Sequence, residues 1–146
     1  MTETTDTQKL KSPWHLWLVG VLSLVWNGFG CVDFAMTATQ NAAYLSSYPE
    51  EMLAYWLSMP WYIWALWAIG VFGGLAGSIA LLMRRKMAVW LFGASFLAAF
   101  ISNLFGALDK NAPRMEGAAM FGMIIILIAL GLVLYAGWMS RRGILR

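Results

Sequence analysis

The stretch that organises the chain is Trp26-Asn27-Gly28-Phe29-Gly30-Cys31-Val32-Asp33. It lies inside an apolar segment long enough to cross a membrane, yet it carries an amide, two glycines and a carboxylate. On a helix, Asn27, Gly30 and Asp33 fall within roughly 120° of one another, and Thr37 continues the stripe. Polar groups at membrane depth are costly, so they need partners or a function. We therefore expect another helix to pack closely over Gly30.

Composition places the chain among the polytopic membrane proteins. Its 146 residues are 61% hydrophobic and 12% charged, whereas soluble domains carry about 25% charged residues. The polar start of the chain predicts that there is no cleavable signal peptide. Cys31 is the single cysteine, which excludes an internal disulfide. We expect no nucleic-acid partner, because topology accounts for the basic residues.

Four apolar segments predict four membrane-spanning helices of about 22 residues each, enough to cross a core of about 30 Å. The expected spans are residues 14–38, 61–83, 87–108 and 118–140. They predict an all-α membrane protein in which residues 13–146 form one antiparallel four-helix bundle. Residues 1–12 are expected to be a disordered cytoplasmic tail, and Pro13 suits the start of the first helix.

The connection at residues 40–60 predicts a short helix on the outer membrane surface. Ser47 and Glu50 have the spacing of a capping box, with Ser47 as N-cap, and an amphipathic run follows. Pro60 is expected to end this interfacial helix.

The distribution of basic residues predicts the orientation. With both termini inside, only Lys110 and Arg114 face outward. Eight basic residues then face the cytoplasm, as expected from the positive-inside rule: Lys9, Lys11, Arg84, Arg85, Lys86, Arg141, Arg142 and Arg146. We therefore expect a bacterial inner (plasma) membrane protein with its N- and C-termini inside.

Small residues predict where helices pack most closely. Gly70 with Gly74, and Gly73 with Gly77, are small-xxx-small pairs on the second span, and Gly30 lies on the first. Such spacing lets helix backbones approach each other in lipid.

A polar cluster inside the membrane is the candidate site. We expect it to contain Asn27, Asp33, Thr37, Ser102 and Asn103. Asp33 is either a proton or cation site or a structural carboxylate, and its depth of roughly 7 Å favours the structural role. Asn27 is expected to make an interhelical hydrogen bond.

Two segments share the pattern N-x-F-G-x-x-D. One is Asn27 to Asp33 and the other is Asn103 to Asp109. A genuine repeat would relate spans one and two to spans three and four about an axis along the membrane normal. Since the second and fourth spans do not match, we favour coincidence.

The residues of catalytic and cofactor sites do not assemble into a recognisable pattern. His15 is the single histidine, which excludes a bis-histidine haem within one chain, and no zinc-ligand spacing occurs. No Ser, His and Asp arrangement suggests a nucleophile. The sequence therefore predicts a non-enzymatic protein without cofactor or metal.

Four segments of the chain resemble a set of small, uncharacterised four-helix inner-membrane proteins of proteobacteria. They are Leu24-Val25-Trp26-Asn27 with Gly30 and Asp33, Trp67-Ala68-Ile69-Gly70, Arg84-Arg85-Lys86, and the final Arg141-Arg142-Gly143-Ile144-Leu145-Arg146. The resemblance implies the fold and the location. Some of these proteins carry a sugar-transporter label, which implies transport.

Two functions remain open from the sequence. The favoured one is an accessory or scaffold component that packs in the bilayer against a larger membrane partner or against itself. The alternative is a small proton-linked solute transporter that acts as a dimer, with Asp33 as its titrating group. The first predicts that Gly74→Leu breaks assembly, and the second that Asp33→Asn abolishes transport.

Overall fold

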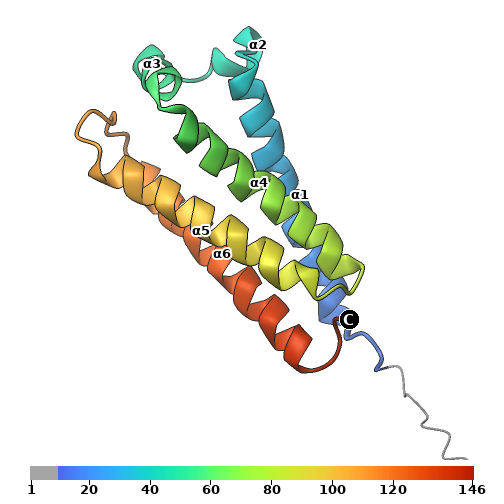
Figure 1. Ribbon diagram of the computed structural model, residues 1–146. Helices are drawn as coiled ribbons and strands as arrows, with labels where there is room; N and C mark the ends of the chain where they lie inside the picture. The colour runs from blue at the N-terminus through green and yellow to red at the C-terminus, as the bar shows by residue number, and fades with distance from the viewer. Residues whose placement is uncertain (1–9) are drawn as a thin grey trace, which may run out of the picture.

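The computed structural model describes residues 10–146, which contain six helices (Figure 1). Four are long: α1 (Trp14–Ala38), α4 (Trp61–Leu82), α5 (Met87–Leu108) and α6 (Ala118–Arg141). The short helices α2 (Ala42–Leu45) and α3 (Glu50–Ser58) lie between α1 and α4. Residues 1–9 of the expected tail lie outside the described residues.

The four long helices are the predicted spans. They contain 22 to 25 residues, begin and end within one residue of the expected bounds, and are apolar enough to cross a membrane. Successive long helices run in opposite directions. The prediction of an all-α membrane protein with an antiparallel four-helix bundle is confirmed.

Proline sets the start of three helices. Pro13, Pro49 and Pro60 are the N-cap residues of α1, α3 and α4. Because proline lacks an N–H and its φ is fixed near −65°, it fits where a helix starts and not inside one. Pro13 therefore has the role that the sequence predicts.

The expected capping box at Ser47 is wrong. Pro49 disfavours helical backbone at the residue before it, so α3 begins only at Glu50. The Ser47 hydroxyl instead donates to the carbonyl oxygen of Tyr44 at 3.1 Å. Helix α2 was not predicted, because four residues carry too little periodicity.

The helices form two arms. The first arm contains α1, α4 and residues 42–58, which we call the cap; the second arm contains α5 and α6. Figure 1 shows the arms meeting at the α4–α5 turn and diverging toward the cap. Helix α4 packs against α1 and α5, and α5 packs against α6. Helices α1 and α6 meet through side chains, at His15 with Tyr135 and at Trp26 with Phe121.

The buried core lies at the end of the bundle with the α4–α5 turn, which we call the basic end. Its best-buried large side chains, no more than 1% exposed, are Leu16, Leu81, Phe92, Met139 and Leu145. Here residues 143–146 fold back onto the α4–α5 turn. The N–H of Arg146 donates to the carbonyl oxygen of Arg84 at 2.7 Å, and Arg84 Nε donates to that of Ile144 at 3.1 Å. The arms are thus joined at the basic end.

Leu145→Ala is expected to lower the free energy of unfolding by about 2–5 kcal/mol, because it leaves a cavity in this core. The matched control is Leu134→Ala on α6, where the side chain is 61% exposed and loses few contacts. Thermal unfolding of both variants in one detergent measures the difference. An equal loss of stability in the two variants would contradict the assignment of the core.

Candidate functional site

A cavity of about 670 Å³ lies between the two arms, on the cap side of the core. Its walls come from all four long helices and from the cap. Its polar side chains are Asn27, Asp33, Tyr44, Tyr48, Ser95, Ser102 and Asn103, and its tryptophans are Trp26, Trp56, Trp64 and Trp67. The volume is within the range of about 300–1,000 Å³ that is usual for small-molecule sites.

Asp33 is the one charged side chain among the described residues that line this cavity. It lies in the last two turns of α1, where the Tyr44 hydroxyl donates to its Oδ1 at 2.6 Å. That hydrogen bond and, secondarily, burial raise the pKa of Tyr44, so its phenol remains a neutral donor at physiological pH. Tyr44 therefore orients the side chain of Asp33 through this hydrogen bond.

Asn27 lies two turns deeper along the same face of α1. Its Nδ2 donates to the carbonyl oxygen of Ser23 at 2.8 Å and reaches Ser78 Oγ on α4 at 3.4 Å. The expected interhelical contact is thus present, and the amide also lines the cavity.

Ser102 and Asn103 of α5 line the same cavity as Asn27 and Asp33. Asn103 Nδ2 donates to the carbonyl oxygen of Ala99 at 2.9 Å, within its own helix. Four of the five residues expected in the polar cluster therefore line the same cavity.

Thr37 is separated from the other members of the cluster. It is 1% exposed and does not line the cavity, and its hydroxyl donates to the backbone carbonyl oxygen of Asp33 at 2.8 Å. Neither Thr37 nor Asn103 donates to the Asp33 carboxylate, because the side chains of both donate to nearby backbone carbonyl oxygens. Helical Thr and Asn side chains often bond this way.

Two tryptophans of α4 form an aromatic wall that was not predicted. Trp64 and Trp67 line the cavity, and Phe34 of α1 packs edge-on against both, with ring centroids 6.0 and 5.2 Å away. The i, i+3 spacing of Trp61, Trp64 and Trp67 was the available signal, but Trp61 is 79% exposed. Only the packing seen in the structure shows that Trp64 and Trp67 line the cavity and that Trp61 does not.

The predicted packing glycines all face helices of the same chain. A Cβ on Gly30 would lie 3.0 Å from Val71 of α4, and one on Gly74 would overlap the Asn27 amide of α1. The other three lie against α5, where their nearest neighbours are Ala99, Ser95 and Phe92: Gly70, Gly73 and Gly77. These glycines therefore allow close packing between helices of the same chain.

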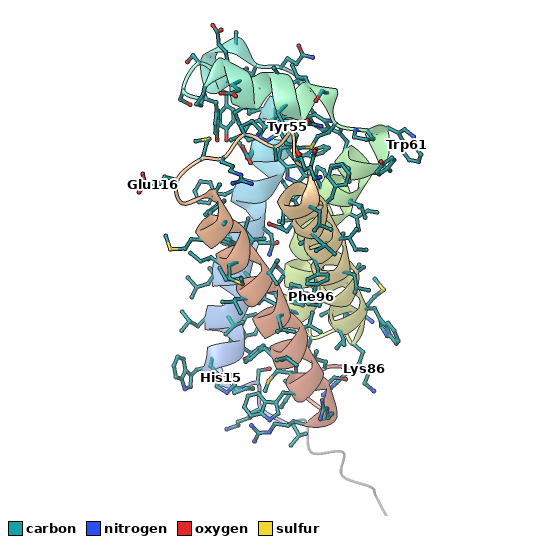
Figure 2. All side chains as sticks on the ribbon, turned by 90° about the vertical axis from the view of Figure 1, so that its left-hand side faces the viewer. His15, Tyr55, Trp61, Lys86, Phe96 and Glu116 are labelled. Atoms are coloured by element: carbon teal, nitrogen blue, oxygen red, sulfur yellow. The ribbon has the colours of Figure 1, made fainter. Side chains whose placement is uncertain are left out.

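A contact between α1 and α6 closes the side of the bundle at the basic end. His15 Nδ1 and the Tyr135 hydroxyl are 2.6 Å apart, and the His15 ring stacks on Trp138 with centroids 5.8 Å apart. Figure 2 shows His15 low on α1, far from the cap. The cavity therefore has a packed floor toward the basic end and the cap over its other end.

Residues 10–146 form no cluster of metal ligands. No group of three or more His, Cys, Asp or Glu side chains gathers there as metal ligands. The chemistry that the cavity offers is therefore hydrogen bonding, one negative charge and aromatic faces.

Comparison with known proteins identifies relatives that match most of the chain. No family model and no solved structure matches it. The arginine exporter protein ArgO of Salmonella typhimurium strain LT2, of Salmonella typhi and of Salmonella paratyphi C is 31% identical over 144 residues. The match covers 92% of this chain and 67% of each relative. These relatives are named as exporters, in agreement with the prediction of a non-enzymatic membrane protein. The chain belongs to the family of the arginine exporter ArgO.

Proposed function

We propose that this protein exports a cationic amino acid of the arginine type, and that Asp33 binds the cationic group in the cavity. The observation that carries the proposal is the position of Asp33 as the one charged side chain of an aromatic-walled cavity. A carboxylate pairs with a guanidinium through two parallel hydrogen bonds. Membership of the exporter family supports the proposed activity, and the position of Asp33 in the cavity supports the proposed site.

The other walls suit the same solute. Trp64 and Trp67 offer aromatic faces, which attract cations such as guanidinium. The amides of Asn27 and Asn103 and the hydroxyl of Ser102 offer hydrogen bonds to the backbone groups of an amino acid. No basic side chain lines the cavity among the described residues, so an anionic solute would lack a partner.

We place the protein in the bacterial inner membrane with its basic end in the cytoplasm, in accord with the positive-inside rule. The cavity then lies on the periplasmic side of its packed floor. The α1–α6 side of the bundle is joined by a few side-chain contacts, at His15 with Tyr135 and at Trp26 with Phe121, and it is the side on which we place a second copy of the chain. We therefore propose a homodimer as the transporting unit.

The accessory or scaffold role gains no support from the glycines of α4, because they contact α1 and α5 of the same chain. Proton-linked transport is the second candidate, because a carboxylate partly removed from water is a proton site as well as a cation site.

Transport of labelled solutes out of proteoliposomes that contain the purified chain tests the proposal. Arginine is compared with citrulline, its neutral isostere, and with glutamate. We expect arginine to be preferred over citrulline by about tenfold or more, because only arginine can pair with Asp33. Equal rates for arginine and citrulline, or no arginine flux, would overturn the proposal.

A further inference from the structure

One hydrogen bond joins the two arms at the cap end of the cavity. The Tyr55 hydroxyl on α3 donates to Oδ2 of Asp109, the residue that ends α5, at 2.9 Å. Figure 2 shows Tyr55 where the cap approaches the second arm. Within residues 10–146, the other hydrogen bonds between the arms lie deeper: Ser95 to Gly70, His15 to Tyr135, and those of residues 144–146 with the α4–α5 turn.

The cap itself is attached to the first arm. It continues directly from α1 and into α4, and Tyr44 ties it to Asp33. Tyr48 and Trp56 pack edge to face with centroids 5.1 Å apart, which joins its two parts. A separation of the arms at this end would therefore carry the cap away from α5 and would break the bond between Tyr55 and Asp109.

The bond between Tyr55 and Asp109 is well formed at neutral pH. Burial and then the hydrogen bond to Asp109 raise the pKa of Tyr55 to about 12, so the phenol is protonated throughout the physiological range. Neither residue lines the cavity, so this bond can break without altering the side chains around Asp33.

We propose that Tyr55 and Asp109 form the latch of a gate at the cap end of the cavity. While they are bonded, the cap covers the cavity; when the bond breaks, the arms separate at this end and the cavity opens. The buried core and the hydrogen bonds at the basic end hold the arms together there, so the opening is confined to the cap end. This inference rests on the proposed function for one point only, the identity of the solute that the open gate releases.

The accessibility of a thiol in the cavity tests the latch. In a Cys31→Ser background, Ser102→Cys places a thiol on the cavity wall, and its reaction with a charged, membrane-impermeant reagent is timed. Tyr55→Phe removes the latch hydroxyl and keeps the ring. Tyr62→Phe is the matched control, because the hydroxyl of Tyr62 has no hydrogen-bond partner among residues 10–146, while its ring packs against Phe105.

We expect Tyr55→Phe to accelerate the modification of position 102 by about threefold to tenfold, since one hydrogen bond is lost from the closed state. Tyr62→Phe should leave the rate unchanged. Equal rates in the two variants would overturn the latch. A second thiol, placed by Ser78→Cys where the side chain is fully buried, measures whether the whole bundle is destabilised. If that thiol also reacts faster in Tyr55→Phe, the variant is destabilised and the gate is wrong.

Arginine efflux, measured with Tyr55→Phe and Tyr62→Phe in the otherwise unaltered chain, separates this inference from the proposed function. Because Tyr55 does not line the cavity, its loss should change kcat and leave KM for arginine within about twofold. If the parent protein moves no arginine, the proposed function fails, and the modification rates still decide whether the latch exists. If arginine moves and the rates are equal, only the latch fails.

Discussion

Asp33→Asn is expected to abolish arginine export while the chain still folds. The substitution removes the one charged side chain of the cavity and changes its shape very little. The Tyr44 hydroxyl can still donate to the new amide oxygen, so the cap keeps its attachment to α1. A cation that enters the cavity then meets aromatic and neutral polar groups only.

The expected loss in kcat/KM for arginine is at least about thirtyfold, because leaving a desolvated charge without its partner costs about 2–5 kcal/mol. Efflux from proteoliposomes with equal protein content measures it. Asp33→Glu keeps the charge and should retain part of the activity, and Glu51→Gln, on the exposed face of α3, should retain all of it. If Asp33→Asn transported arginine at the wild-type rate, Asp33 would not be part of the binding site.

A second assay on the same variant distinguishes cation binding from proton coupling. Exchange of labelled for unlabelled arginine across the vesicle membrane needs substrate binding but no net movement of protons. If Asp33 binds the cation, Asp33→Asn loses exchange and net efflux together. If Asp33 only carries the proton, exchange survives and net efflux alone is lost.

The sequence was sufficient for the four long helices because each of them has a strong local signal. Four long apolar segments and the prolines at residues 13 and 60 place the helices to within one residue. The glycine spacing on α4 correctly indicates close packing, but glycine spacing does not say which helix fills the groove. The structure assigns Gly74 to α1 and Gly70, Gly73 and Gly77 to α5.

The candidate site was predicted only in part. Asn27, Asp33, Ser102 and Asn103 line one cavity, whereas Thr37 of the expected cluster does not. The hydrogen-bond partner of Asp33 is Tyr44, which comes from a four-residue helix in a connecting segment. Periodicity cannot place a side chain of such a segment over the end of α1, so the partner could not be found from the sequence.

The N-x-F-G-x-x-D similarity has a counterpart in the structure. Asp33 and Asp109, the last residues of the two segments, each accept a hydrogen bond from a tyrosine of the cap, Tyr44 and Tyr55. The two carboxylates differ in surroundings, because Asp33 lines the cavity and Asp109 does not. The common feature is therefore attachment of the cap, and only Asp33 is placed to bind a solute.

Gly74→Leu is expected to separate α1 from α4 and to lower the free energy of unfolding by about 3 kcal/mol, the upper part of the usual range for overpacking. A side chain at this position would occupy the space of the Asn27 amide, which also bonds Ser23 and approaches Ser78. Neither helix backbone can yield without losing contacts along the α1–α4 interface. The floor of the cavity would be disrupted as well.

The matched control is Gly28→Leu on α1, where a Cβ meets nothing within 4 Å. Thermal unfolding of both variants in one detergent, with particle mass read at low temperature, measures the effect. The intramolecular contact predicts that Gly74→Leu is destabilised even where it remains monomeric, and that Gly28→Leu unfolds like the parent. The opposite outcome is a Gly74→Leu protein that keeps the parental stability and loses only its association with a partner or a second copy. That result would restore the accessory role, because the glycine would then serve assembly between chains.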